Sequence, residues 1–563
     1  MMKKLPIGIE NFEELRRDGC YYVDKTGMIE KLLQQTFKVQ LITRPRRFGK
    51  TLMMSMLAEF FDCRKDTKNI FEDLEISEQK KLCAGWRNQW PVLFLTLKDV
   101  GGNDFDGAYG ILQFVLSSLC IEHSYLEESE WVDPDDRESF LRLKGRSGDK
   151  TDVKSALCVI MRMMQAHYRK PVIVLIDEYD VPLAQASEKG YYEEMLDVIR
   201  GLLGMALKTN ASLKFAVVTG CLRIAKESIF TGTNNFLSDT ISGKQFDKYF
   251  GFTENEVSKL LEDTELVEHK AEMREWYDGY RFGSKEVYCP WDVLNHVNRL
   301  QNDPQAKPAN YWKNTSHNGI IRSFIERTDL AVNQKFETLL SGGCVKEKIC
   351  EDLTYDILHI SEENLWSVLY LTGYLTQADT QETGSAGEMG QEAIALKIPN
   401  QEIRSIFTDT VEKWFADSVI AMDRRELFDA FWNGEEKKIN EILSDLLFDT
   451  ISYHDYKESY YHAFLAGIFS GAGYAVESNC EYGLGRPDLV VREGRKRRAL
   501  IIEVKHSKKE SEMESDCQKA MSQIDTKKYA REFLKGYRIV LCYGIAFFEK
   551  ECLIRKCEGC FEK

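Results

Sequence analysis

The stretch Val39-Gln-Leu-Ile-Thr-Arg-Pro-Arg-Arg-Phe-Gly-Lys-Thr51 decides the fold of the first half of the chain. An apolar strand over Val39–Thr43 leads into a basic turn, and the helical stretch Leu52–Phe61 follows it. A strand, a turn ending in Gly-Lys-Thr and a helix are typical of a Walker A loop, where backbone N–H groups and the helix N-terminus bind phosphate. We therefore predict that Lys50 reaches the β- and γ-phosphates of ATP and that Thr51 ligates Mg²⁺.

One part of this loop departs from the usual pattern. The first glycine of G-x-x-x-x-G-K-[ST] falls at Arg44, and Pro45 has no N–H to donate. The first turn of the loop must therefore differ from that of a standard Walker A sequence. The loop residues that we predict to bind the nucleotide are Arg46, Arg47, Gly49, Lys50 and Thr51.

A second strand, Val172–Ile176, runs directly into two carboxylates. In a Walker B strand, the first of them, Asp177, holds Mg²⁺ through water, and the second, Glu178, orients or deprotonates the attacking water. A strand that merely ends in exposed acids is the alternative, but the order of the two motifs along the chain favours the catalytic interpretation. The strand Leu213–Val218 ends at Thr219, a polar residue placed to sense the γ-phosphate if this strand lies between the other two.

Short apolar strands alternate with helical stretches through the first half of the chain, which predicts an α/β fold with a parallel sheet and helices on both faces. The strands are Val39–Thr43, Val92–Leu97, Val172–Ile176 and Leu213–Val218. A chain of 563 residues is too long for one core. We expect a nucleotide-binding domain over residues 1–250, a helical middle region over 251–430, and a small α/β domain over 431–563.

The last of these domains carries Pro487-Asp488 and, fifteen residues after Asp488, Glu503-Val504-Lys505. Two adjacent strands joined by a basic hairpin would bring Asp488, Glu503 and Lys505 together. Two carboxylates can hold Mg²⁺ or Mn²⁺, which activates a water molecule, while a lysine stabilises the transition state of phosphodiester cleavage. Glu481, upstream, would add a further acid to the metal site. An edge strand with solvated charges is the alternative interpretation.

The chain resembles the bacterial AAA-ATPase-like proteins, which carry a C-terminal nuclease-like domain of the PD-(D/E)XK superfamily. The segments that carry the resemblance are Leu5–Phe12, Tyr22–Thr26, Arg44–Thr51, Asp177–Asp180 and Trp276–Tyr280. In that family the Arg-Pro-Arg-Arg-Phe-Gly-Lys loop is usual, so Arg44 is expected as a family trait. The resemblance implies a P-loop NTPase-type sheet, a restriction-endonuclease-like C-terminal fold, and a supporting role for Gln523 at the nuclease site.

Composition limits the choice of partners and compartment. The formal net charge is −15, so a nucleic acid would be bound only in a local groove. We expect DNA, in preference to RNA, as that partner. No apolar run is long enough to span a bilayer, and the N-terminus lacks an apolar signal core, so we expect a cytoplasmic protein without a membrane partner. Enzymes of the AAA type often form rings, which leaves a homo-oligomer open.

Two complete-looking sites on one chain lead us to expect an ATP-regulated, metal-dependent nuclease, an activity that would suit defence against foreign DNA or mobile-element biology. The main alternative is a non-hydrolysing nucleotide-binding switch or scaffold whose nuclease-like domain binds nucleic acid without cutting it. A third possibility is a docking scaffold built on the aromatic side chains of the middle region, although large aromatics more commonly pack a core. These aromatics are Trp276, Tyr277, Tyr280, Trp291, Tyr311 and Trp312.

Overall fold

The computed structural model of the chain forms two compact units. It describes residues 4–223, 236–312, 335–336, 338–351, 353, 362–378, 393–408, 425–450, 458–478, 482, 485–557 and 561–562. The N-terminal unit comprises Met1–Ser316 with Cys344–Arg404, and the C-terminal unit comprises His317–Gly343 with Ser405–Lys563. The N-terminal unit thus holds both the predicted nucleotide-binding region and much of the middle region, while the three-part division at residues 250 and 430 stays a prediction.

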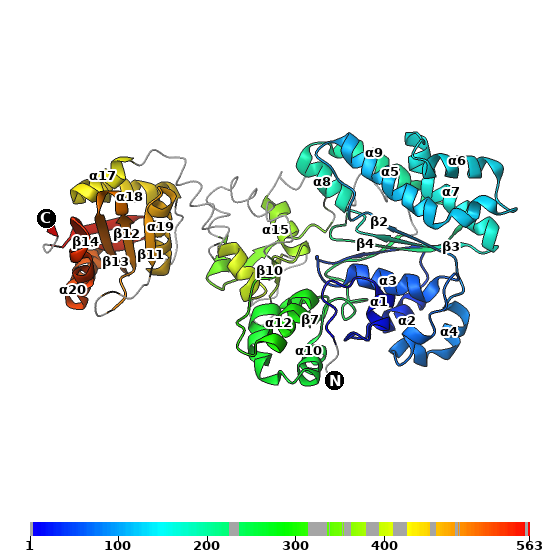
Figure 1. The fold of residues 1–563 in the computed structure, drawn as a ribbon, viewed down its shortest axis with the longest axis horizontal. Helices are drawn as coiled ribbons and strands as arrows, with labels where there is room; N and C mark the ends of the chain where they lie inside the picture. Colours follow the sequence, from blue (N-terminus) through cyan, green and yellow to red (C-terminus); the bar gives the residue numbers. More distant parts are fainter. Residues whose placement is uncertain are drawn as a thin grey trace. The chain divides into compact units, whose positions relative to one another are not determined.

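A parallel sheet forms the centre of the N-terminal unit (Figure 1). It has five strands, in the order β2-β3-β4-β1-β5. Its strands are β1 (Val39–Thr43), β2 (Val92–Thr96), β3 (Val172–Asp177), β4 (Leu213–Gly220) and β5 (Phe236–Asp239). Every residue of β1 and of β3 is buried, as expected for a parallel sheet covered on both faces. The strand β4, which ends at Thr219 and Gly220, lies between β1 and β3, as the sensor interpretation of Thr219 requires.

Helices cover both faces of this sheet, as predicted (Figure 1). One face carries α1 (Phe12–Arg17), α2 (Gly27–Leu33), α3 (Lys50–Phe61) and α4 (Lys80–Trp86). The other face carries α5 (Phe105–Glu122), α6 (Pro134–Lys144), α7 (Lys150–Tyr168), α8 (Val181–Lys189) and α9 (Tyr192–Leu207). None of the helices in the described parts of the chain is long and apolar enough to cross a membrane.

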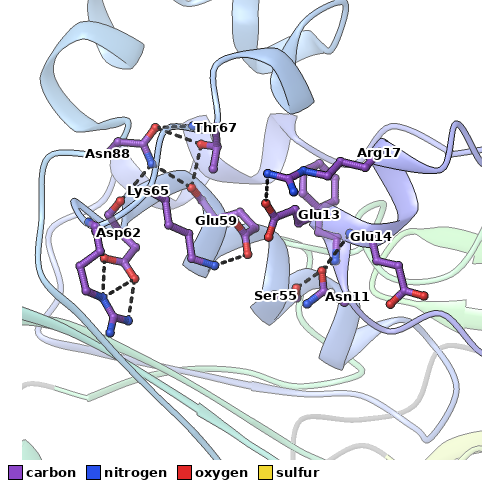
Figure 2. Close-up of polar contacts among 12 residues, drawn as sticks. Asn11, Glu13, Glu14, Arg17, Ser55, Glu59, Asp62, Lys65, Thr67 and Asn88 are labelled. Atoms are coloured by element: carbon purple, nitrogen blue, oxygen red, sulfur yellow. Dashed lines mark hydrogen bonds and ion pairs between the residues drawn. The ribbon is translucent and has the colours of Figure 1, made fainter. Parts of the chain in front are cut away.

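Polar contacts fix the far end of α3, the helix that begins at the predicted phosphate loop (Figure 2). The Asn88 side chain donates to the backbone carbonyls of Glu59 and Asp62, at 3.2 and 3.0 Å, and so satisfies carbonyl groups of the last helical turn. Earlier in the helix, the Ser55 hydroxyl accepts a bond of 2.9 Å from the Phe12 backbone N–H at the start of α1. The helix is therefore held in place at a distance from its functional N-terminus.

The middle region packs around buried aromatic side chains. Its elements in the N-terminal unit are α10 (Glu254–Asp263), α11 (Lys270–Tyr277), β6 (Tyr280–Phe282), β7 (Lys285–Val287), α12 (Pro290–Asn302), β8 (Val345–Glu347), α15 (Glu362–Leu371), β9 (Thr376–Gln377) and β10 (Ile394–Lys397). Tyr277, Tyr280 and Trp312 are almost fully buried, as the core interpretation of these aromatics predicts. Lys25 ties the N-terminal segment to α10, since its Nζ lies 2.7 Å from both carboxylate oxygens of Glu256.

The C-terminal unit is a mixed α/β domain. Its six-stranded sheet contains β11 (Ala475–Ser478), β12 (Leu489–Glu493), β13 (Arg498–His506), β14 (Ile539–Phe548), β15 (Glu551–Lys556) and β16 (Phe561–Glu562). The helices α17 (Arg425–Asn433), α18 (Glu436–Thr450) and α19 (Glu458–Gly471) pack on one face, and α20 (Met513–Lys527) packs on the other. Pairing between β13 and β14 is parallel, and β12 and β13 form the predicted hairpin.

Arg44, at the position of the missing Walker A glycine, is a fully buried structural residue. Its guanidinium forms an ion pair of 2.6 Å with Asp239, at the end of β5, and donates to the carbonyl of Thr240 at 2.7 Å. The rings of Phe250 and Phe282 lie 5.2 and 5.4 Å from its central carbon. Arg44 therefore joins the end of β1 to the end of β5.

Replacing Arg44 by Met is expected to destabilise the protein by about 3–5 kcal/mol, because Asp239 would keep a buried charge without its counter-ion. Urea unfolding of the full chain measures this loss. The matched control is Lys98→Met, which breaks an exposed ion pair of 2.9 Å with Glu10 and should cost less than about 1 kcal/mol. Equal effects of the two changes would contradict the assigned role of Arg44.

Candidate active sites

The loop between β1 and α3 has the backbone of a phosphate-binding turn. Gly49 has φ +83°, in the left-handed region that favours glycine, and α3 begins at the next residue, Lys50. A Cβ at Gly49 would meet no atom within 4 Å, so the backbone angle, and not a lack of space, requires glycine here. The N-terminus of a 12-residue helix thus opens directly onto the loop and supplies positive potential for an anion.

Lys50 lies buried among the groups of this loop. Its Nζ donates to the carbonyl oxygens of Arg44 and Pro45, at 3.2 and 3.1 Å, and lies 3.4 Å from Glu178 Oε1. Burial acts to lower the pKa of Lys50, but Cys221 and the neighbouring carboxylates, Glu178 first among them, raise it overall. The ammonium group therefore stays charged and is available to bind phosphate oxygens.

Asp177 connects three elements of the site. One of its carboxylate oxygens accepts a bond of 2.8 Å from the Thr51 hydroxyl on α3, and the other accepts a bond of 2.6 Å from the Thr219 hydroxyl on β4. Burial raises the pKa of Asp177, and the bond from Thr219 opposes that shift. A hydroxyl and a carboxylate at the start of a phosphate-binding helix are a donor set that fits Mg²⁺. The structure thus brings Lys50, Thr51, Asp177 and Thr219 together.

Glu178 follows β3 with φ +54°, an angle that costs energy for a residue with a side chain. The next two residues hold this turn in place. The Asp180 carboxylate accepts bonds from the backbone N–H groups of Cys221 and Leu222, at 3.0 and 2.9 Å, and the Tyr179 hydroxyl donates to the Leu222 carbonyl at 2.7 Å. Asp180, the last residue of Asp177–Asp180, was not among the site residues predicted from the sequence.

The two loop arginines predicted to bind nucleotide differ in their surroundings. Arg47 donates to the carbonyl of Tyr311 at 2.5 Å, and its guanidinium lies 5.2 Å from the ring centre of Trp291, so its side chain contacts the middle region. Arg46 is half-buried on the loop. Direct binding of nucleotide by either side chain stays a prediction.

The predicted nuclease trio lies at the junction of β12 and β13. Asp488, just before β12, accepts a bond of 2.8 Å from the Val504 backbone N–H, and its own N–H lies 3.4 Å from Glu503 Oε2. Lys505 Nζ lies 3.3 Å from the other oxygen of Glu503 and donates to the Val504 carbonyl at 3.0 Å. The structure therefore brings Asp488, Glu503 and Lys505 together as the spacing predicted.

The Glu503 side chain is buried, with only 1% of its surface exposed. Burial, followed by the charge of Asp488, raises the pKa of Glu503 to about 7, against the opposing charge of Lys505. Two carboxylates of like charge, Glu503 buried and Asp488 half-buried, fit a divalent cation, which relieves their repulsion. In the part of the chain that the structure describes, no three His, Cys, Asp or Glu side chains form a metal-binding group, and Glu481 lies outside the described residues.

Two residues that sequence reasoning did not assign hold the segment before β12. His462, on α19, makes a hydrogen bond through Nε2 with the backbone carbonyl of Asp488. Tyr529, buried after α20, donates its hydroxyl to the carbonyl of Arg486 at 3.1 Å. Gln523 is half-buried on α20, and its supporting role stays a prediction.

Comparison with known proteins identifies both domains. Residues 6–230 match the AAA-ATPase-like family model, described as a predicted AAA-ATPase, and residues 456–557 match the model of the PD-(D/E)XK nuclease superfamily. The chain joins an AAA-ATPase-like domain to a PD-(D/E)XK superfamily domain. It is also similar to an Azotobacter chroococcum mcd 1 protein named "Uncharacterized protein in vnfD 5'region", with 25% identity over 500 residues that cover 87% of each chain.

The matched ranges contain the predicted site residues. The AAA-ATPase-like range includes β1 to β4 with the loop, Asp177 and Thr219, and the PD-(D/E)XK range includes Asp488, Glu503 and Lys505. Both halves of the resemblance proposed from the sequence are therefore confirmed at the level of the domains. The whole middle region, residues 251–430, lies between the two matched ranges.

The pKa of Glu503 predicts how metal binding by the PD-(D/E)XK domain depends on pH. Because the folded-state pKa is about 7, protons compete with the metal below this pH. The affinity for Mn²⁺, measured by calorimetry on the full chain, should rise about tenfold per pH unit up to pH ~7 and then level off. In Glu503→Gln, the residual affinity should lack this rise, whereas an unchanged profile would show that another group titrates.

Proposed function

We propose that the N-terminal unit binds ATP with Mg²⁺ and hydrolyses it. The bridging of Asp177 by the hydroxyls of Thr51 and Thr219 carries this proposal, because it joins a metal ligand, a helix N-terminus and a sensor strand in one site. Lys50 binds the phosphate oxygens, and Glu178, held beside it, takes a proton from the attacking water. Mg²⁺, when bound, neutralises charge on the phosphates.

We further propose that the C-terminal unit cleaves nucleic acid, with DNA the preferred substrate. Asp488 and Glu503 would hold Mg²⁺ or Mn²⁺, which activates a water molecule when bound. Lys505, beside Glu503, stabilises negative charge on the phosphate as the bond breaks. The net charge of −15 supports binding in a local groove, with a strong dependence on salt. We also propose that the protein is cytoplasmic, and we leave a homo-oligomer and a role in defence or mobile-element biology as extensions of this function.

A second function is favoured by one observation at the loop. Lys50 is bound by the carbonyls of Arg44 and Pro45 in its own loop, and Pro45 contributes no N–H for phosphate. These features suit a switch that binds nucleotide without hydrolysing it, joined to a nuclease-like domain that binds nucleic acid without cutting. The two functions differ in whether Glu178 is needed for phosphate release.

Two substitutions separate binding from hydrolysis. Lys50→Ala should weaken ATP binding at least tenfold, since it removes the cation that contacts the phosphates. Glu178→Gln should retain ATP binding but lower the hydrolysis rate by about 10²-fold or more, because the amide cannot accept the proton. Binding is measured by calorimetry and turnover by phosphate release. Tight binding without release by the unaltered protein would favour the switch.

Cleavage assays test the nuclease. Plasmid and single-stranded DNA are incubated with the full chain and Mg²⁺ or Mn²⁺, with and without ATP. Asp488→Ala and Lys505→Ala should each abolish cleavage, whereas Lys519→Ala, which changes an exposed lysine of α20 paired with Asp516, should not. A cleavage rate that changes with ATP only when Lys50 is intact would support coupling. Failure to cut either DNA would contradict the DNA assignment and direct the test to RNA.

A further inference from the structure

The phosphate loop is held from outside by the middle region. Arg47, at φ +70°, donates to the Tyr311 carbonyl at 2.5 Å and lies over the Trp291 ring. The next loop residue, Phe48, packs against the rings of Tyr280 and Phe282, with centroids 4.9 and 4.8 Å away. Because of these contacts, a change in the loop backbone either moves residues of the 280–312 segment or is opposed by their packing.

The peptide that Arg47 contacts is held from its other side by Glu402. The backbone N–H groups of Tyr311 and Trp312 donate to Glu402 Oε1, at 2.5 and 3.0 Å. Glu402 is fully buried, and burial, followed by the charge of Asp292, raises its pKa well above the ordinary value. A carboxyl group in the neutral form can accept these bonds through one oxygen without the cost of a buried charge.

This set of contacts lies where the chain leaves the N-terminal unit. Glu402 belongs to the helical residues 401–408, which begin in the N-terminal unit and continue past its boundary at Arg404. Trp312 lies shortly before Ser316, where the chain leaves this unit for the first time. The Asn400 side chain fixes the start of the helical residues, since it accepts a bond from the Ile403 N–H at 3.0 Å and donates to the Asp278 carbonyl at 2.8 Å.

We propose that Arg47 transmits the phosphate-bound state of the loop, through the Tyr311–Trp312 peptide and Glu402, to the two connections that lead out of the N-terminal unit. The proposal rests on the proposed binding of nucleotide by this unit. Phosphate binding requires the loop N–H groups to face the anion, and Arg47 belongs to that backbone. If the loop backbone differs between the phosphate-bound and phosphate-free states, the hydrogen bond from Arg47 to the Tyr311 carbonyl also differs between them. Coupling between two sites requires such a contact that differs between the states.

Hydrogen–deuterium exchange of the full chain tests this relay, with saturating Mg·ADP and Mg·ATPγS as probes. Peptides covering 309–312 and 400–404 should change their exchange rates by at least about threefold on binding. In Arg47→Met, that change should be lost, while the change at the N-terminus of α3 persists. Glu402→Gln is the matched control, because its amide oxygen still accepts both N–H groups, and it should retain the response.

The outcomes separate the relay from the proposed function. The relay alone would be overturned if Arg47→Met bound nucleotide, measured by calorimetry, and showed the same exchange response as the unaltered protein. Absence of nucleotide binding in the unaltered protein would overturn both. Should Arg47→Met bind no nucleotide, Glu402→Leu decides, since it removes the acceptor of both N–H groups and lies outside the loop. A normal response of residues 400–404 in that variant would then count against the relay.

Discussion

Two hydroxyl groups on one carboxylate organise the N-terminal unit. Asp177 is the last residue of β3, and its oxygens are bound by Thr51 from α3 and Thr219 from β4. This arrangement is possible only because β4 lies between β1 and β3, so that the carboxyl ends of all three strands meet at one edge of the sheet. That strand order also places the phosphate loop with Lys50 beside the turn at Glu178.

Much of this arrangement could be predicted because its signals are local. Continuous apolar runs predicted β1 and β3, and the residues that follow them carried the phosphate-site motifs. The Asp488 to Glu503 spacing likewise predicted a hairpin and a shared site. The partners of Arg44 and His462 could not be predicted, since Asp239 lies far along the chain from Arg44 and His462 contacts a backbone carbonyl. Contacts between residues far apart in the chain, and contacts to backbone atoms, produce no hydrophobic periodicity and no motif in the sequence.

The two sites treat a buried carboxylate in different ways. Asp177 accepts hydrogen bonds from two neutral hydroxyl groups and lies near Lys50. Glu503 has Asp488 as a close neighbour of like charge and one lysine to offset it, and its pKa rises to about 7. Burial raises the pKa of both carboxylates, and a neighbouring carboxylate raises each of them further, Glu178 for Asp177 and Asp488 for Glu503.

The strand order also bears on how the chain matures during synthesis. Strand β1 leaves the ribosome early, but its two neighbours in the sheet are β4 and β5, which end at Gly220 and Asp239. Until both have emerged, a fully apolar strand and the basic loop after it have no place to pack, and such exposed edges invite wrong pairing. The nascent protein therefore passes through an interval in which the phosphate-loop motif has been synthesised but the strands that hold it in the sheet have not.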